Sequence, residues 1–208
     1  MAKEFAGKGC PLNEEGMAKV TGRLGTGVAE VWAVLTVETR GCGFLPDRRP
    51  FILYERHIFS RETSRKFDLS HPDISNRTTG GYGAGGPNQY DRLFRAIGLD
   101  RRAALRSASW GIGQVMGFNA ETAGYGDVEE MVAAMTESET EQLLAMSGEI
   151  LRNKLDGPLR SHDWATFAKG YNGPAYRKTT MIRGFLPRIR SSVQDRCRTS
   201  RSARPRSI

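Results

Sequence analysis

Apolar and polar positions recur with helical spacing near the start of the chain. Residues 12–24 form an amphipathic pattern with Asn13 near its start, which predicts a short helix. A Gly-Thr-Gly segment then breaks the pattern, and its Thr26 can cap a second helix. The apolar run 28–37 follows, closed by Glu38 and a Gly-rich turn. The sequence therefore predicts two helices before residue 40, the second more apolar than the first.

The middle of the chain loses this periodicity. Residues 44–54 combine the turn residues Pro46 and Asp47 with short extended pieces, which predicts a small β-hairpin directly after the second helix. A third helix is expected over residues 55–65. Residues 71–88 are rich in Gly, Pro, Asn and Ser and predict a long irregular loop, of the kind that is usually functional or disordered.

Helical spacing returns in the second half of the chain. The expected helices cover residues 89–97, 101–107, 128–135, 137–154 and 162–171. Asp127 is a predicted N-cap, and Asp163 places negative charge at the start of the last helix, where it suits the helix dipole. The predicted fold class is mainly α (α+β), with a minor β element in one domain.

Composition limits the class of protein further. With 208 residues, 38% apolar and 26% charged, the chain has the length and composition of one soluble globular domain. It contains no apolar stretch long enough to span a membrane and no hydrophobic signal region at its start. The net charge of +8 is concentrated in residues 177–208, which carry ten Lys and Arg and one acid. The remainder is near neutral, which argues against a specific nucleic-acid-binding body.

Glu38 is the candidate with the clearest chemistry. A carboxylate at the C-terminal end of an apolar helix meets the negative end of the helix dipole and loses solvation, and both effects raise its pKa. A carboxylic acid that stays protonated near neutral pH can protonate the leaving oxygen of a glycoside. The simpler interpretation is a helix-end carboxylate that faces solvent.

Further motifs accompany Glu38 in a characteristic order. Residues 109–116 place a Gln in an apolar, Gly-interrupted run, and residues 171–176 (Tyr-Asn-Gly-Pro-Ala-Tyr) end a helix with a polar aromatic and an amide. Together with the strings at 54–59 and 71–76, they resemble the lysozyme-like superfamily and, within it, the N-acetylmuramidase family of phage and prophage endolysins. The resemblance runs from about residue 12 to about residue 178.

The resemblance implies a peptidoglycan-degrading glycoside hydrolase that takes part in host cell lysis. Such an N-acetylmuramidase hydrolyses the β-1,4 bond between N-acetylmuramic acid and N-acetylglucosamine, with Glu38 as general acid and with no cofactor or metal. No Cys/His cluster in the sequence has metal-site spacing.

The identity of a second carboxylate stays open. Asp47, nine residues after Glu38, lies in the expected hairpin, as the second carboxylate of phage-type lysozymes does, but Pro-Asp is also a common turn pair. Glu55 follows an apolar strand and has Arg56 and His57 beside it, so an ion pair is its structural alternative.

Four residues are candidates for substrate binding. Gln114 suits a hydrogen bond to a sugar N-acetyl group or to the attacking water, or it holds a turn through backbone bonds. Ser109 can bond Glu38 or cap that turn. Tyr171 can orient Glu38 or line the saccharide cleft, and Asn172 either binds substrate or caps the helix.

Two other functions fit the same sequence. A lytic transglycosylase would cleave the same bond with Glu38 alone and form a 1,6-anhydro sugar. A non-catalytic protein would bind the cell envelope or nucleic acid through the basic C-terminal residues, by charge alone.

The expected domain division is a catalytic domain over residues 1–178 and a basic, disordered tail over residues 179–208. The tail departs from the family pattern after Lys178, which is consistent with a frameshift near Thr179. The expected partner is bacterial peptidoglycan, with anionic envelope contacts through the tail and no specific nucleic acid. The protein is expected to be a monomer made in the host bacterial cytoplasm that acts on the cell wall in the periplasm after release.

Overall fold

The computed structural model describes residues 4–38 and 42–172, with residues 36–38 and 172 described by their backbone alone. The helices and strands follow in chain order: α1 (Glu14–Leu24), α2 (Val28–Glu38), β1 (Ile52–Tyr54), α3 (Arg56–Glu62), α4 (Asn88–Ile97), α5 (Arg101–Arg106), β2 (Ala108–Trp110), β3 (Val115–Met116), the 3₁₀ helix η1 (Gly117–Asn119), α6 (Ala120–Ala123), α7 (Val128–Glu137), α8 (Glu139–Arg152), α9 (Asp156–Arg160) and α10 (Trp164–Asn172). The expectations for residues 179–208 lie outside the described residues.

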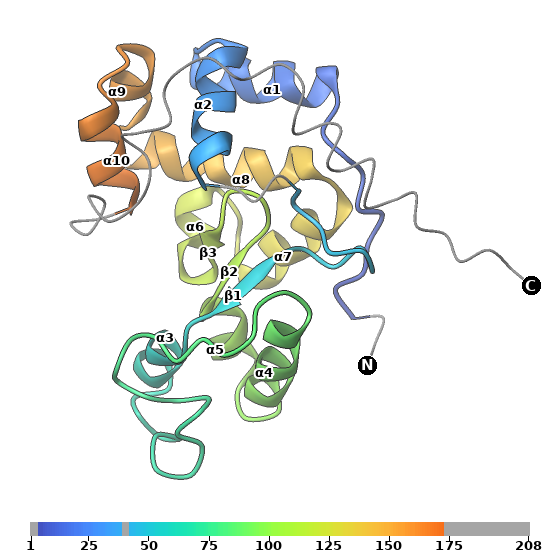
Figure 1. Ribbon diagram of the computed structural model, residues 1–208, viewed down its shortest axis with the longest axis vertical. Helices are drawn as coiled ribbons and strands as arrows, with labels where there is room; N and C mark the ends of the chain where they lie inside the picture. Colours follow the sequence, from blue (N-terminus) through green and yellow to red (C-terminus); the bar gives the residue numbers. More distant parts are fainter. Residues whose placement is uncertain (1–3, 39–41, 173–208) are drawn as a thin grey trace, which may run out of the picture.

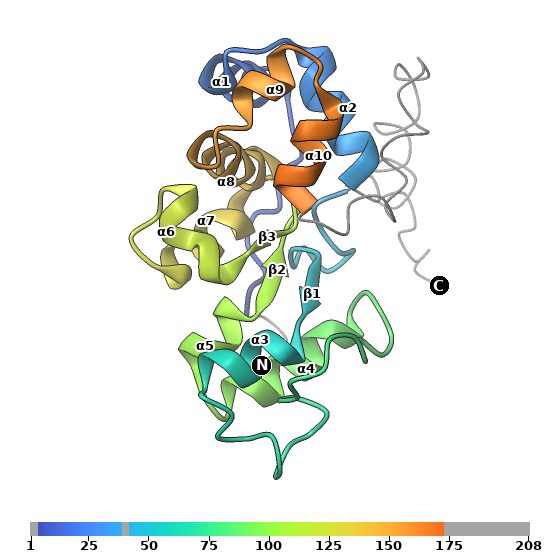
Figure 2. The same cartoon turned by 90° about the vertical axis from the view of Figure 1, so that its left-hand side faces the viewer.

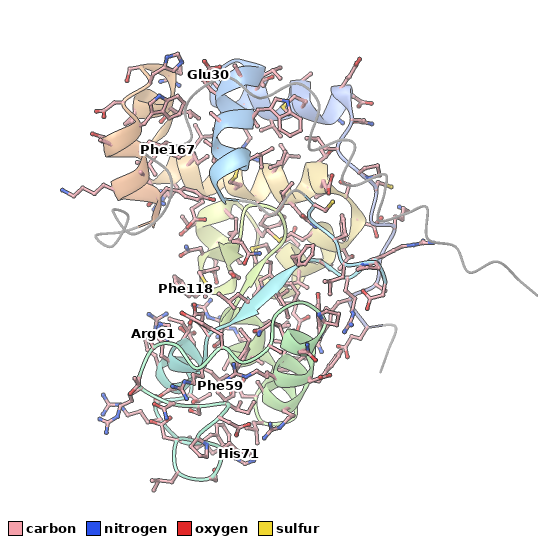
Figure 3. All side chains as sticks on the ribbon, viewed as in Figure 1. Glu30, Phe59, Arg61, His71, Phe118 and Phe167 are labelled. Atoms are coloured by element: carbon pink, nitrogen blue, oxygen red, sulfur yellow. The ribbon has the colours of Figure 1, made fainter. Side chains whose placement is uncertain are left out.

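The predicted mainly α (α+β) class is confirmed. Figures 1 and 2 both place α1, α2, α9 and α10 at one end of the molecule and α3, α4 and α5 at the other, with the sheet between them. Figure 3 marks the two ends through Phe167, on α10, and through Phe59 and His71 in the opposite region. The lysozyme-like arrangement thus surrounds one small antiparallel sheet with helices.

Capping side chains begin several helices where the sequence predicts. Asn13 Oδ1 accepts a hydrogen bond from Gly16 N at 2.8 Å, and Asp127 Oδ1 accepts one from Glu130 N at 2.8 Å. Asp163 Oδ1 accepts one from Thr166 N at 3.1 Å. Each bond satisfies a backbone donor that has no partner inside the helix. The expected cap from Thr26 is wrong, because its buried hydroxyl has no hydrogen-bond partner among the described residues.

Two predicted helix boundaries are wrong for identifiable reasons. The expected helix over 55–65 ends at Glu62, since Ser64 and Arg65 adopt positive φ angles of 50° and 68°. The expected helix over 137–154 is broken at Ser138, whose extended backbone forms a bridge with Cys10. The Ser138 hydroxyl then caps α8 by accepting from Glu141 N at 3.1 Å.

The expected hairpin over 44–54 is confirmed only as a tight turn. Phe44 and Pro50 form a single antiparallel bridge around it. Strand β1 instead pairs with β2, with Leu53 opposite Ser109, and β2 pairs in turn with β3. The sheet therefore joins β1 to a strand more than 50 residues later in the chain. It also contains a second strand pair, β2 with β3, which the sequence pattern did not predict.

The core lies on both sides of this sheet. Trp110 and Tyr54 are fully buried, and each polar atom has a partner: Trp110 Nε1 donates to Leu105 O at 3.0 Å and the Tyr54 hydroxyl donates to Ile74 O at 3.0 Å. The second bond ties the long loop between α3 and α4 to β1. Burying large aromatics with their polar atoms satisfied makes the sheet a rigid base for the loops around it.

The α6–α8 contact depends on a glycine. A Cβ on Gly148, in the middle of α8, would overlap the backbone of Ala123, whereas a Cβ on Gly22, in the middle of α1, would meet no atom within 4 Å. We expect Gly148→Ala to lower the free energy of unfolding by about 1–3 kcal/mol through overpacking. Gly22→Ala should raise it by about 0.5–1 kcal/mol, because Ala is the better helix former.

Urea denaturation of both variants tests whether the two substitutions change the free energy of unfolding in opposite directions. A neutral or stabilising Gly148→Ala substitution would contradict the close packing of α8 on α6.

Candidate active site

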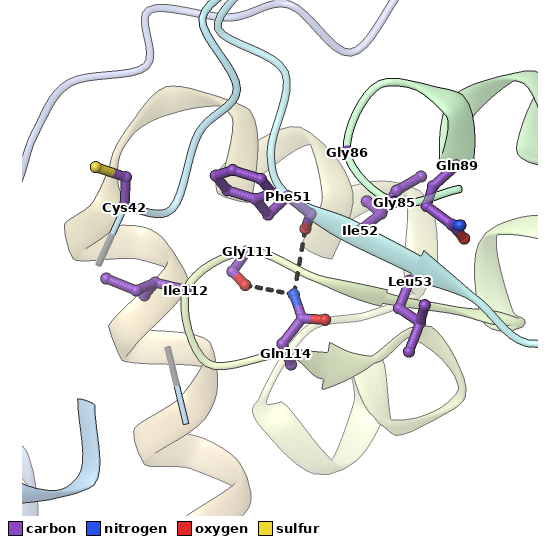
Figure 4. Close-up of a pocket in the computed structure, with 10 residues that line it drawn as sticks. All are labelled: Cys42, Phe51, Ile52, Leu53, Gly85, Gly86, Gln89, Gly111, Ile112 and Gln114. Carbon is purple, nitrogen blue, oxygen red and sulfur yellow. Dashed lines mark hydrogen bonds between the residues drawn. The ribbon is translucent and has the colours of Figure 1, made fainter. Parts of the chain in front are cut away.

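A pocket of about 190 Å³ opens at the edge of the sheet (Figure 4). Its described lining is Cys42, Phe51, Ile52, Leu53, Gly85, Gly86, Gln89, Gly111, Ile112 and Gln114. The walls thus come from β1, from the turn between β2 and β3, from the glycine-rich loop before α4 and from the segment that follows α2. Gly85, Gly86 and Gly111 contribute only backbone to this lining, so the shape there depends on how their loops are held.

Gln89 fixes the glycine-rich loop against β1. It is 1% exposed, and its Nε2 donates to Tyr82 O at 2.8 Å and to Ala84 O at 2.7 Å. Its Oε1 accepts from Tyr54 N at 3.0 Å. One buried amide therefore connects the loop that the sequence predicts to be irregular to the strand that forms the floor of the pocket.

Gln114 lies at the end of the turn between β2 and β3, with a φ angle of 50°. Its Nε2 donates to Gly111 O at 2.8 Å and more weakly to Phe51 O at 3.4 Å, as Figure 4 shows. Its Oε1 accepts from Ser109 Oγ at 2.9 Å. The side chain therefore closes the turn through backbone bonds, which is one of the two roles that the sequence left open for it.

This bonding determines what Gln114 can offer a ligand. An amide nitrogen has two hydrogens and an amide oxygen has two lone pairs. Both hydrogens already point at carbonyl oxygens, and one lone pair is used by Ser109. The remaining lone pair can accept a hydrogen bond, so Gln114 can bind a hydroxyl, a water or an N-acetyl N–H, but cannot donate to a sugar oxygen without breaking the turn.

Tyr171 supports the same turn from α10. Its hydroxyl donates to Gly113 O at 2.9 Å, and its ring stacks on Phe167 with centroids 5.6 Å apart. Tyr171 thus joins Ser109 and Gln114 at one turn, a contact that the sequence did not predict. Asn172 is the last residue of α10, and its side chain lies outside the described part of the chain.

Glu38 is the last residue of α2, as the sequence predicts, and its side chain also lies outside the described part. The chain next enters the described structure at Cys42, which lines the pocket. Helix α2 therefore ends four residues before Cys42 in the pocket wall.

Asp47 does not line the pocket. It occupies the exposed turn between Phe44 and Pro50, where its carboxylate bonds the side chain of Arg49, Nε to Oδ2 at 2.8 Å, and the backbone N–H of the same residue at 3.1 Å. Partial burial would raise the pKa of Asp47, but these bonds to Arg49 outweigh it and hold that pKa below its ordinary value. This arrangement corresponds to the turn-forming role that the sequence left open for Asp47 as the alternative to catalysis.

Glu55 does not line the pocket either. Its side chain is 14% exposed at the start of α3, and Oε2 lies 3.1 Å from His57 Nδ1. Tyr82 is nearby: burial first, and then the Glu55 carboxylate, raise the pKa of that phenol. Glu55 Oε2 and His57 Nδ1 lie within ion-pair distance, but each is buried without a hydrogen-bond partner among the described residues.

Sequence reasoning missed the buried amides of Gln89 and Gln142, which hold the pocket walls. Gln142 occupies the apolar stripe 142–146–150 of α8 and is fully buried. An amide on an apolar stripe was the available signal, since such a group needs partners when buried.

The described residues contain no group of three or more His, Cys, Asp or Glu side chains arranged to hold a metal ion. Nor does any helix in the described ranges have the length and apolarity needed to cross a membrane.

Comparison with known proteins agrees with the lysozyme-like α+β architecture. The family model for N-acetylmuramidase matches residues 27–183, which include α2, every wall of the pocket and α10. The chain therefore belongs to the N-acetylmuramidase family. The crystal structure of the Burkholderia AP3 phage endolysin is similar, with a TM-score of 0.75 and 43% sequence identity over 80% of this chain. The match spans 65% of that endolysin's length. No curated protein matches.

Gln114→Glu tests the assigned orientation of the amide. The substitution places a carboxylate oxygen against the carbonyls of Gly111 and Phe51, and we expect the free energy of unfolding at pH 7 to fall by about 1–3 kcal/mol. This repulsion raises the pKa of the new carboxyl above its unfolded value. The missing stability should therefore return as the pH falls below the unfolded pKa and be lost again as the pH rises through the folded pKa.

Urea denaturation between pH 4 and 7 measures this effect, with Ser109→Ala as the control. That control removes one neutral donor, so it should cost about 0.5–1.5 kcal/mol without the same pH dependence. A Gln114→Glu protein as stable as the wild type at pH 7 would mean that Nε2 does not face the two carbonyls.

Proposed function

We propose that this protein is a peptidoglycan-degrading endolysin, an N-acetylmuramidase that hydrolyses the β-1,4 bond between N-acetylmuramic acid and N-acetylglucosamine. Glu38 is the proposed general acid. The observation that carries the proposal is the position of Glu38 at the end of α2, four residues before the pocket wall at Cys42, within a family match that spans both.

The physical setting of Glu38 supports this role. The carbonyl groups at the C-terminal end of a helix carry partial negative charge, and an anionic carboxylate is disfavoured there. The preceding residues Val34 and Leu35 are buried, so α2 is packed into the core close to its end. A carboxyl in such a place retains its proton at higher pH, as donation to a leaving oxygen requires.

The proposed reaction uses the two sides of the pocket. Glu38 gives its proton to the glycosidic oxygen as the bond to the muramic acid carbon breaks. A water molecule then attacks that carbon and leaves a reducing end. The free lone pair of Gln114 is suited to accept a hydrogen bond from this water or from an N-acetyl N–H. Ser109, Tyr171 and Asn172 are proposed to hold the turn or contact the saccharide around it.

The lytic transglycosylase is the second candidate, and one observation favours it. No carboxylate side chain is among the described residues that line the pocket, and both Asp47 and Glu55 are engaged elsewhere. A transglycosylase needs no second carboxylate, because the C6 hydroxyl of the sugar itself attacks the anomeric carbon. Asp47 and Glu55 remain the candidates for the hydrolytic reaction.

The proposed partner is peptidoglycan, met in the periplasm after release from the host cytoplasm. We propose that residues 1–178 act as the catalytic domain and as a monomer, and that contacts of the basic tail with an anionic envelope are accessory. A non-catalytic protein acting through that tail would not depend on Glu38.

Glu38→Gln keeps the size of the side chain and removes the proton. We expect turnover of purified peptidoglycan to fall by about 10²–10⁴-fold, the usual loss when a general acid is removed. Folding, checked by circular dichroism and urea denaturation, should be retained. Turnover of peptidoglycan at a near wild-type rate would contradict the assignment of Glu38 as the acid.

Mass spectrometry of the soluble products from the same digests distinguishes the two enzymes. We expect muropeptides with reducing N-acetylmuramic acid ends from the wild type. Products 18 Da lighter, from 1,6-anhydro ring closure without water, would show that the enzyme is a transglycosylase and not a hydrolase. Glu38 would remain the proposed acid. Reducing N-acetylglucosamine ends would contradict the choice of bond.

A further inference from the structure

The first two turns of α8 contain two buried polar side chains that lie outside the pocket lining. Gln142 is 0% exposed and Glu139 is 7% exposed. A buried amide and a buried carboxylate are costly unless their polar atoms are satisfied. Their partners are backbone groups of segments far away in the sequence.

Gln142 connects the two walls of the pocket. Its Oε1 accepts from Ile112 N at 2.7 Å, in the turn that ends with Gln114. Its Nε2 donates to Gly43 O at 3.3 Å, in the segment that follows the acid-bearing helix, and to Met135 O at 3.0 Å. One side chain therefore contacts both the segment after Glu38 and the turn that presents Gln114.

Glu139 holds the same segment from its other side. Its Oε1 accepts from Gly43 N at 2.8 Å and its Oε2 accepts from Leu12 N at 2.9 Å. Both the N–H and the C=O of Gly43 are thus bonded to side chains of α8. The Gly43 carbonyl also accepts from Phe51 N at 2.9 Å, which brings a further part of the pocket wall into the same network.

The fit around Gln142 is close. A Cβ on Gly43 would overlap the Gln142 amide, and one on Gly111 would lie 2.6 Å from its Cγ and Cδ. Gly111 also adopts a φ angle of 67°, which favours glycine. Gly111, which lines the pocket, and Gly43, which follows the pocket residue Cys42, therefore leave space for one glutamine, and the backbone at each glycine lies directly against it.

We propose that Gln142 is a positioning residue for catalysis: it sets the distance between the segment carrying Glu38 and the turn carrying Gln114, and Glu139 fixes the first of these. This inference rests on the proposed function. A general acid and a group that binds the substrate must keep a fixed separation, and a misplacement of about 1 Å can cost about 10²-fold in rate. Gln142 acts through Gly43 and Ile112 and does not contact the substrate.

Gln142→Leu retains much of the volume and removes all three hydrogen bonds. We expect kcat on soluble peptidoglycan fragments to fall by about 10- to 100-fold, with KM changed by less than about threefold. The alkaline limb of the pH–rate profile should move to lower pH by about 0.5–1 unit, since a loosened segment after α2 gives Glu38 more solvent and favours its charged form.

Two controls separate positioning from stability alone. Met131→Ala, in the core on α7, should destabilise the fold by about 2–5 kcal/mol but leave kcat per folded molecule and the alkaline limb unchanged. Ser147→Ala removes a buried hydroxyl on α8 whose one recorded bond among the described residues is to Leu144 O of the same helix, and it should also leave both unchanged.

Glu139→Gln is the milder second variant, should Gln142→Leu fail to fold. It keeps the shape but turns one acceptor into a donor, so Gly43 N or Leu12 N loses its partner. We expect kcat to fall by about three- to tenfold, with a smaller shift of the alkaline limb in the same direction. Unchanged kcat and an unchanged alkaline limb in Glu139→Gln would contradict its part in the proposal.

Hydrogen exchange gives a readout that is independent of activity. The Ile112 amide should exchange faster in Gln142→Leu than in Met131→Ala, both compared after correction for global stability. If Gln142→Leu loses only stability, with the kcat and alkaline limb of the wild type, the positioning role is wrong. If Glu38→Gln retains activity, the proposed function fails instead, and the exchange of Ile112 still tests the contact itself.

Discussion

The hydrogen bonds of the buried Gln142 amide are the interaction on which the candidate site depends. The amide bonds to three segments that are distant in the sequence: the residues after α2, the turn between β2 and β3, and the end of α7. Burying it without these bonds would cost roughly 1–3 kcal/mol. The bonded arrangement is therefore strongly preferred, and the pocket takes its shape from it.

Helix α8 extends this role to the rest of the molecule. At 14 residues it is about 21 Å long, and it packs against α1, α6 and α7 and against β3. Its Glu139 bonds to the N-terminal segment at Leu12, and Gly148 lets α6 approach closely. Two walls of the pocket, the segment after α2 and the turn between β2 and β3, are thus held by one helix. The loops around the pocket include glycines and have little side-chain packing of their own. Their positions are therefore fixed by the rigid helix to which they are bonded.

Much of the helical framework could be predicted from the sequence, because its signals are local. Asn13 and Asp127 cap helices where a polar residue precedes an apolar pattern, and Glu38 ends α2 where a Gly-rich turn begins. The pairing of β1 with β2 could not be predicted, since short strands carry little periodicity and their partner lies more than 50 residues away. The sequence predicts a break between α7 and α8 but places it two residues before Ser138, because helical spacing continues on both sides of that residue.

Some residues of the candidate site could likewise be predicted from the sequence, and others could not. Ser109 and Gln114 belong to one sequence motif and Tyr171 to another, so all three could be named as candidates. The structure brings them to one turn. Gln142 and Glu139 carry no motif. The position of Gln142 on an apolar stripe is a weak sequence signal, but its partners Gly43 and Ile112, and the bond of Glu139 to Gly43, are visible only in the structure.

We propose that the pocket beside this turn is the saccharide site, with Gln114 as a hydrogen-bond acceptor. A ¹H–¹⁵N NMR titration of the Glu38→Gln protein with an N-acetylglucosamine oligomer tests it most directly. We predict shifts of the backbone amides of Gly85, Gly86, Gly111 and Ile112 and of the Gln114 side-chain amide, with little change on α3. Saturable shifts confined to another surface, with these amides unmoved, would contradict the account.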